Sequence, residues 1–143
     1  MRTMLEAMVR GEVPPPPVAE TVGMRLVEIG DGEARFELEA EQSRHANPMG
    51  TLHGGILCDL VDAAMGCAYA SRLGEGETFT TLELKINFLK PVWSGLLTAR
   101  AAIVRGGRTI GLVECDVLDA AGALVARASA TCMTLRGELA RGR

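Results

Sequence analysis

Apolar and polar residues follow two different periods along this chain, one typical of strands and one typical of a helix. In residues 33–39 the apolar side chains Ala34, Phe36 and Leu38 alternate with charged ones, which predicts a strand with one buried and one wet face. A shorter apolar run, residues 24–29, precedes it across the turn signal Gly30-Asp31-Gly32. The two runs together predict a hairpin.

A longer period follows a polar loop, residues 41–52, which is broken by Asn47-Pro48 and Gly50. Spacing of i, i+3 and i+4 predicts a helix over residues 54–71. Its apolar face comprises Ile56, Leu57, Leu60, Ala64 and Ala68. The other side, which carries Asp59, Asp62, Met65, Gly66 and Tyr69, is also largely apolar. We therefore expect a sheet to cover one face and a partner subunit to cover the other.

The remainder of the chain is predicted to be strand. Four runs, separated by turn signals, are expected at residues 78–89, 95–104, 109–118 and 124–135. The order of hairpin, helix and antiparallel meander predicts an α+β fold with one helix against one sheet. The proline run, residues 14–17, leads us to divide the chain into an N-terminal arm, a single domain and a C-terminal tail, which are residues 1–18, 19–137 and 138–143.

Charge and cysteine content exclude several classes of function. The net charge is −3 and the pI is about 5.4, which argues against general nucleic-acid binding because that requires a basic face. No run approaches the roughly 20 apolar residues of a membrane helix. Two histidines and four cysteines without a C-x-x-C pair predict no metal site and free thiols. We expect a cytoplasmic protein that binds neither membrane nor nucleic acid.

The predicted helix starts with His53-Gly54-Gly55, where backbone N–H groups lack partners and carry partial positive charge. A carbonyl oxygen placed against the Gly55 N–H would be polarised, although two glycines can equally serve loop-to-helix packing. Asp62 lies roughly 10 Å further along the helix axis, too far to meet a group held at Gly55 of the same chain. A second, antiparallel copy of the helix would bring the two residues together, which predicts a dimer with shared sites.

The segment Asn47-Pro48-Met49-Gly50-Thr51-Leu52-His53-Gly54-Gly55, followed by Asp62-Ala63-Ala64-Met65-Gly66, resembles the signature of the PaaI-type hotdog thioesterases. The resemblance extends over about residues 24–135. It implies the hotdog fold, in which a curved antiparallel sheet wraps one long central helix. It also implies active sites between two protomers, a homodimer that pairs further into a homotetramer, and no cofactor or metal.

The resemblance also assigns roles to individual residues. Asn47 and His53 match the polar residues that orient the nucleophilic water or the loop, although His53 can instead be structural, with a ring nitrogen that caps loop backbone. Gly55 matches the amide that polarises the thioester carbonyl. Asp62 matches the general base or nucleophile. Thr81 falls where relatives hold the water with Ser or Thr, but Thr80 is its neighbour and a slip of one residue would reverse its face.

Substrate contacts are expected at the helix and at one turn. Gly54 would allow close approach of the ligand, and Met65 would line an aliphatic acyl pocket. Arg105, Gly106 and Arg108 could meet CoA phosphates, and an ordinary hairpin turn with solvated arginines explains them equally well.

The expected function is hydrolysis of an acyl-CoA thioester to the free acid and CoA. Two alternatives stay open at this point. One is an enoyl-thioester hydratase or dehydratase on the same fold, which differs in the loop before the helix. The other is a non-catalytic acyl-binding protein, since fold alone does not fix function.

Overall fold

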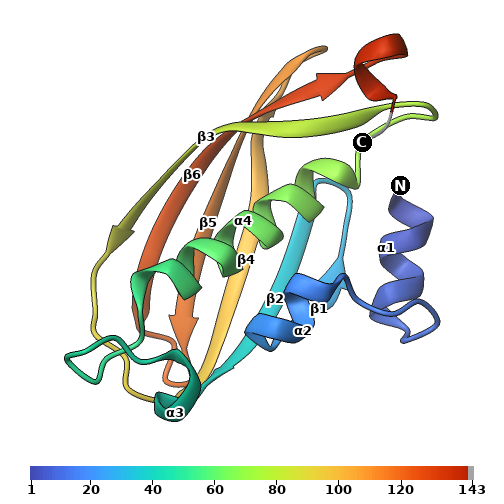
Figure 1. Ribbon diagram of the computed structural model, residues 1–143. Helices are drawn as coiled ribbons and strands as arrows, with labels where there is room; N and C mark the ends of the chain where they lie inside the picture. The colour runs from blue at the N-terminus through green and yellow to red at the C-terminus, as the bar shows by residue number, and fades with distance from the viewer. Residues whose placement is uncertain (142–143) are drawn as a thin grey trace.

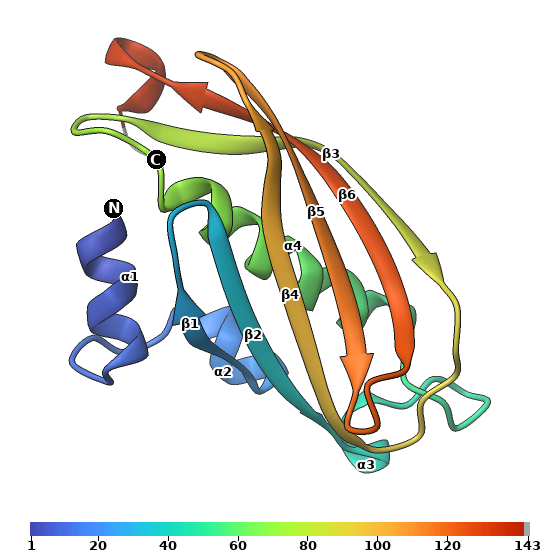
Figure 2. The same cartoon turned by 180° about the vertical axis from the view of Figure 1, so that it is seen from behind.

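A computed structural model describes residues 1–141 and has an α+β architecture (Figure 1). Its long helix α4 (Gly54–Ala70) lies in the concave face of a six-stranded antiparallel sheet, seen from behind in Figure 2. The strands are β1 (Met24–Ile29), β2 (Glu33–Ala40), β3 (Thr78–Phe88), β4 (Gly95–Gly106), β5 (Ile110–Asp119) and β6 (Leu124–Leu135). This wrapped helix confirms the predicted hotdog fold.

The sheet order is β1-β2-β4-β5-β6-β3, so β1 and β3 form its two edges. The predicted alternation in residues 33–39 holds, because Ala34, Phe36 and Leu38 are buried beneath α4. In β3 the register with β6 shifts between Thr81 and Glu83. A bulge of this kind re-aims the side chains that precede it.

The sheet covers more of α4 than the helical wheel predicts. Met65 and Tyr69, expected on the side away from the sheet, are buried at 0% and 5% exposure. All six strands of the curved sheet contact α4, so the contact is not confined to one stripe of the helix. Side chains on the flanks of the helix are therefore enclosed, and only a narrow strip that includes Asp59 and Asp62 stays exposed.

The N-terminal segment contains two helices that periodicity does not reveal clearly, α1 (Arg2–Val9) and α2 (Pro17–Val22). Leu5 of α1 is buried in the core and α1 packs against β1. Helix α2 starts at a proline and ends at Gly23, whose φ of 83° suits glycine. The predicted boundary between arm and domain, at residue 18, falls inside α2. The division into arm and domain stays a prediction.

Two further short helices lie in segments expected to be loop and tail. They are α3 (Gln42–His45) and the 3₁₀ helix η1 (Gly137–Ala140). His45 is buried, where its Nδ1 accepts a hydrogen bond from the Glu41 N–H and its Nε2 bonds to the Val22 carbonyl. This histidine therefore fastens α3 to the end of α2 and is a structural residue.

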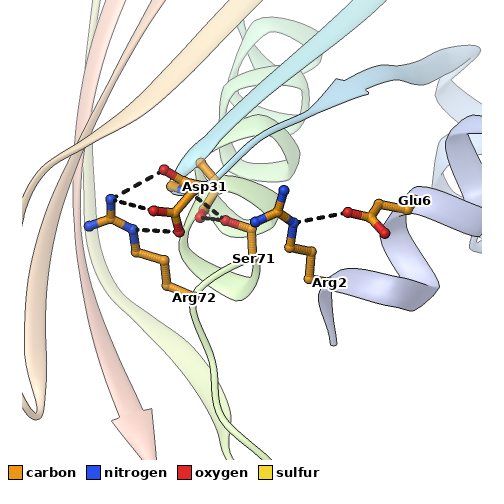
Figure 3. Close-up of polar contacts among 7 residues, drawn as sticks. Arg2, Glu6, Asp31, Ser71 and Arg72 are labelled. Carbon is orange, nitrogen blue, oxygen red and sulfur yellow. Dashed lines mark hydrogen bonds and ion pairs between the residues drawn. The ribbon is translucent and has the colours of Figure 1, made fainter.

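The turn between β1 and β2 is fastened to the end of α4 (Figure 3). The Gly32 N–H donates to Ser71 Oγ at 2.8 Å, and Ser71 Oγ donates to the Ala68 carbonyl. Arg72 Nε contacts Asp31 Oδ1 at 3.1 Å. These contacts fix the hairpin edge of the sheet relative to the helix that carries Asp62.

The four cysteines are free, with Cys115 and Cys132 buried and the other two half-buried. Within residues 1–141 no helix is both long enough and apolar enough to span a membrane.

Candidate functional site

The loop before α4 is shaped by Asn47. Its Oδ1 accepts hydrogen bonds from the Met49 and Thr51 N–H groups at 2.9 and 3.2 Å. Its Nδ2 donates to Thr51 Oγ1 at 2.9 Å. Of the two roles expected for Asn47, these contacts match orientation of the loop. The bend at Gly50, with φ of 83°, lets this closed loop deliver the chain to the helix start.

Helix α4 begins with a histidine cap. His53 adopts extended backbone angles, and its Nδ1 accepts a hydrogen bond from the Gly55 N–H at 2.9 Å. A side-chain acceptor at this position satisfies one of the amide donors that a helix start leaves unpaired. The Gly55 N–H expected to polarise a carbonyl is therefore occupied in the single chain. Among residues 1–141 the Gly54 N–H has no hydrogen-bond acceptor.

Both glycines also have packing reasons to be there. A Cβ on Gly54 would come within 3.0 Å of Phe88 Cζ, and one on Gly55 within 2.9 Å of His53 Nδ1. Phe88, which sequence reasoning did not single out, ends β3 against the helix start. The Phe88 ring thus packs against the backbone at Gly54, and the His53 imidazole packs against the backbone at Gly55.

The histidine cap makes a testable contribution to stability. We expect His53→Ala to destabilise the protein by about 1 kcal/mol, because the Gly55 N–H loses its acceptor. This corresponds to a fall of roughly 3 °C in the melting temperature. His53→Asn, which keeps a capping acceptor, is the matched control and should recover most of the loss. Equal melting temperatures for wild type, His53→Ala and His53→Asn would show that the cap contributes nothing.

The second group of candidate residues lies in the middle of the helix. Asp62 is exposed on α4, and Thr81 Oγ1 of β3 donates to Asp62 Oδ1 at 3.2 Å. Thr81 pairs with Cys132 across the sheet and shares the helix-facing side with it. Thr81, rather than Thr80, is thus the threonine that contacts the carboxylate, and it leaves the second carboxylate oxygen available to a ligand or water.

The thiols near Asp62 are poor nucleophiles. Burial, with a smaller contribution from the negative charge of Asp62, raises the pKa of Cys67 to about 11. Burial likewise raises the pKa of Cys132 to about 11. Because the thiolate is the reactive form, these cysteines are essentially unreactive at neutral pH. Asp62 is therefore the candidate reactive group beside these thiols.

An apolar pocket of about 1120 Å³ opens beside Asp62 and Thr81. Its opposite walls come from α1, α2 and β1, which the sequence did not connect with the site. A sequence feature that could have indicated this wall is the spacing of Met1, Met4 and Met8, which places them on one side of a helix. Met65, expected to line an acyl pocket, is instead wholly buried between α4 and the sheet and does not line this pocket.

The arginine turn lies apart from both groups. Arg105, Gly106 and Arg108 are exposed at the turn between β4 and β5, at the end of the sheet away from the start of α4 (Figures 1 and 2). The Arg108 carbonyl accepts from Arg136. One protomer therefore brings Asp62 together with Thr81 and places Asn47 in the loop that leads to the histidine cap. No hydrogen bond among residues 1–141 joins these two groups to each other or to the arginine turn.

A metal role has no geometric basis in the described chain. Residues 1–141 contain no group of three or more His, Cys, Asp or Glu side chains placed to hold a metal ion. What the site offers is a carboxylate, a helix start and an apolar pocket.

The helix wrapped in a curved sheet, with a carboxylate on its exposed strip, defines a protein of the hotdog thioesterase class. A sequence model of the thioesterase superfamily matches residues 49–126, which include the His53 cap and Asp62. The chain belongs to this superfamily.

Individual relatives share both sequence and structure with the chain. It is 31% identical over 100 residues to the 1,4-dihydroxy-2-naphthoyl-CoA hydrolase of Listeria monocytogenes, covering 70% of this chain and 80% of that protein. The structure of a phenylacetic acid degradation-related protein from Ralstonia eutropha has a TM-score of 0.81 at 34% identity, covering 90% and 98% of the two chains. A mutant of the phenylacetic acid degradation protein PaaI from Thermus thermophilus has a TM-score of 0.76 at 28% identity, covering 82% and 98%. The resemblance to PaaI-type proteins is thereby confirmed.

Proposed function

We propose that this protein hydrolyses acyl-CoA thioesters to the free acid and CoA. The observation that carries the proposal is Asp62, an exposed carboxylate held by Thr81 at the rim of an apolar pocket. Membership of the thioesterase superfamily and similarity to a CoA-thioester hydrolase support thioester chemistry.

Asp62 serves as general base toward water, or attacks the thioester carbonyl itself to form a transient anhydride. In the first route the carboxylate takes a proton from water as the oxygen attacks the acyl carbon, and the thiolate of CoA leaves with the C–S electron pair. Thr81 Oγ1 holds one carboxylate oxygen, which directs the other toward the attacking water or the carbonyl. Thr81 thus acts as a positioning residue.

The start of α4 supplies the groups that stabilise negative charge on the carbonyl oxygen. The helix dipole and the first amides favour an anion there. The Gly55 N–H can donate to the oxyanion once the substrate displaces His53 Nδ1, whereas the Gly54 N–H can donate without any rearrangement. Both sit too far along the axis from Asp62 of the same helix to act on one carbonyl.

A homodimer therefore forms the catalytic unit in this proposal. Strand β3 is an edge of the sheet, and Leu82 and Phe88 on it are more than half exposed. Antiparallel pairing of two β3 edges would lay the two α4 helices side by side in opposite directions. The start of one helix would then lie near Asp62 of the other.

Further association into a homotetramer is also part of the proposal. Exposed apolar side chains on β4 and β5, namely Val104, Ile110 and Leu112, could support contact between dimers. Arg105, Gly106 and Arg108 are proposed to meet the phosphates of CoA bound at a neighbouring protomer, since guanidinium groups bind phosphate well.

The proposal is tested by release of free thiol from a panel of acyl-CoAs that includes acetyl, octanoyl, dodecanoyl, benzoyl and phenylacetyl thioesters. We expect release above the spontaneous rate with at least one of them. An enoyl-CoA included in the panel separates the alternatives, because a hydratase would remove the conjugated absorbance without releasing thiol. No thiol release from any member by folded, oligomeric protein would contradict the proposal.

A further inference from the structure

The pocket beside Asp62 has a wall that lies outside the segment matched by the superfamily. Residues 49–126 match, whereas α1, α2 and β1 precede that segment. Figure 1 shows α1 and α2 on the side of α4 away from the end of β3. One wall of this pocket is therefore supplied by the N-terminal part of this chain, and the other by α4 and β3.

Helix α1 presents two different sides. Leu5 is 4% exposed and packs in the core, which fastens the helix to β1. Met4 lines the pocket and remains 47% exposed, and Met8 lines it while partly buried. The ion pair between Arg2 and Glu6 is drawn on this helix in Figure 3. The helix thus buries only enough apolar surface to stay in place and leaves a methionine stripe facing the pocket.

The other walls are apolar and their side chains are small on the α4 side. Ala63, Gly66 and Ala70 of α4 line the pocket opposite the methionines. Met24 and Leu26 of β1 contribute buried side chains to it. Small residues on one wall and flexible methionines on the other leave room for a ligand of variable shape, since methionine adapts readily to different apolar partners.

The charges around the pocket exclude an anionic occupant. Asp59, Asp62 and Glu20 line it. Two arginines also line it, but each is already paired, Arg10 with Glu12 and Arg25 with Glu37. The phosphates of CoA would therefore be repelled here, and a neutral apolar group fits.

On these grounds, and resting on the proposed function, we propose that the methionine stripe of α1 binds the distal part of a neutral aliphatic acyl chain. The thioester would lie at Asp62 and Thr81, and the chain would extend from there toward Met4 and Met8. The size of the pocket favours an acyl group over a protein segment, because about 1120 Å³ is near the upper end of ordinary ligand sites. Chain-length preference would then be set by the N-terminal helix.

The test compares wild type with the double variant Met4→Ala/Met8→Ala on acetyl-, octanoyl- and dodecanoyl-CoA. We expect kcat/KM for dodecanoyl-CoA to fall about tenfold, because apolar contacts that discriminate between substrates are worth about this much. The value for acetyl-CoA, which does not reach α1, should stay within about twofold. Leu139→Ala, an exposed leucine on η1 outside the pocket, is the matched control and should leave the whole profile unchanged.

A second arm tests charge. Dodecanoyl-CoA should be preferred over the same chain ending in a carboxylate, and Met4→Glu should lower turnover of the neutral long chain more than Met4→Ala does. Thermal melting of each variant confirms that it is folded. A folded, active double variant with an unaltered chain-length profile would overturn the proposal.

Binding of S-dodecyl-CoA, a thioether that cannot be hydrolysed, separates this inference from the proposed function. Calorimetry should show about tenfold weaker binding by the double variant than by wild type. If no acyl-CoA is hydrolysed but this difference appears, the pocket assignment holds and the hydrolase proposal fails. If S-dodecyl-CoA binds equally to both proteins, the pocket assignment fails whatever the activity.

Discussion

Asp62→Asn is expected to lower kcat for acyl-CoA hydrolysis by about 10²–10⁴-fold, the usual contribution of a positioned general base. The amide has nearly the same shape as the carboxylate but cannot accept the proton of water or attack a carbonyl. The Thr81 hydroxyl can still donate to the amide oxygen, so the local structure should be retained. The measurement is steady-state thiol release beside a thermal melting curve.

Two comparisons make this result specific. Glu114→Gln removes an exposed acidic charge on β5, on the face of the sheet opposite to the buried side chains of Val113 and Cys115, and should keep wild-type turnover. Asp59→Asn, one turn earlier on α4, distinguishes the two acids on the exposed strip. A fall in turnover in Asp59→Asn as large as that in Asp62→Asn would show that Asp62 is not the specific base. Unchanged turnover in Asp62→Asn would remove Asp62 from the mechanism.

Gly111→Ala is expected to destabilise the protein by about 1–3 kcal/mol. Gly111 is buried on β5, and a Cβ there would lie 2.5 Å from Tyr69 Cε2 of α4. The tyrosine cannot easily move away, because its hydroxyl bonds to Thr134 Oγ1 at 2.8 Å and its ring packs on Phe79. The added methyl group must therefore shift the helix or break the buried hydrogen bond.

The expected fall in melting temperature is roughly 3–10 °C. Gly106→Ala is the matched control, because a Cβ at Gly106 meets only Ile103 Cγ2 at 3.8 Å. In a Tyr69→Leu background the cost of Gly111→Ala should shrink, since the clashing ring is gone. Equal melting temperatures for Gly111→Ala and Gly106→Ala would show that α4 packs less closely against β5 than the structure indicates.

The strands and the central helix could be predicted because their periods are long and regular. Alternation in residues 33–39 indicated which side chains face the helix, and the helix predicted over residues 54–71 agrees with α4 to within one residue. Thr81 could be named but not chosen over Thr80 from sequence, because the bulge between Thr81 and Glu83 interrupts the simple alternation along the strand. That choice required the register with β6.

The remaining features depend on contacts between distant segments. The burial of Met65 could not be foreseen from a helical wheel, which does not describe how far a curved sheet wraps a helix. Helices α1 and α2 are too short to give a clear period, so their place beside Asp62 was not predicted. A capping role for His53 could be named from the sequence, but the choice of the Gly55 N–H as its partner required the local geometry.

The two edges of the sheet differ in a way that limits assembly. Both β1 and β3 have a hydrogen-bonded neighbour on one side only, but β1 also packs against α1. Two chains that join through β3 use the same edge on both partners, which makes the contact isologous. The outer edges of such a joined sheet would be two β1 strands, each packed by α1, which disfavours further edge-to-edge addition of chains and growth into a fibre.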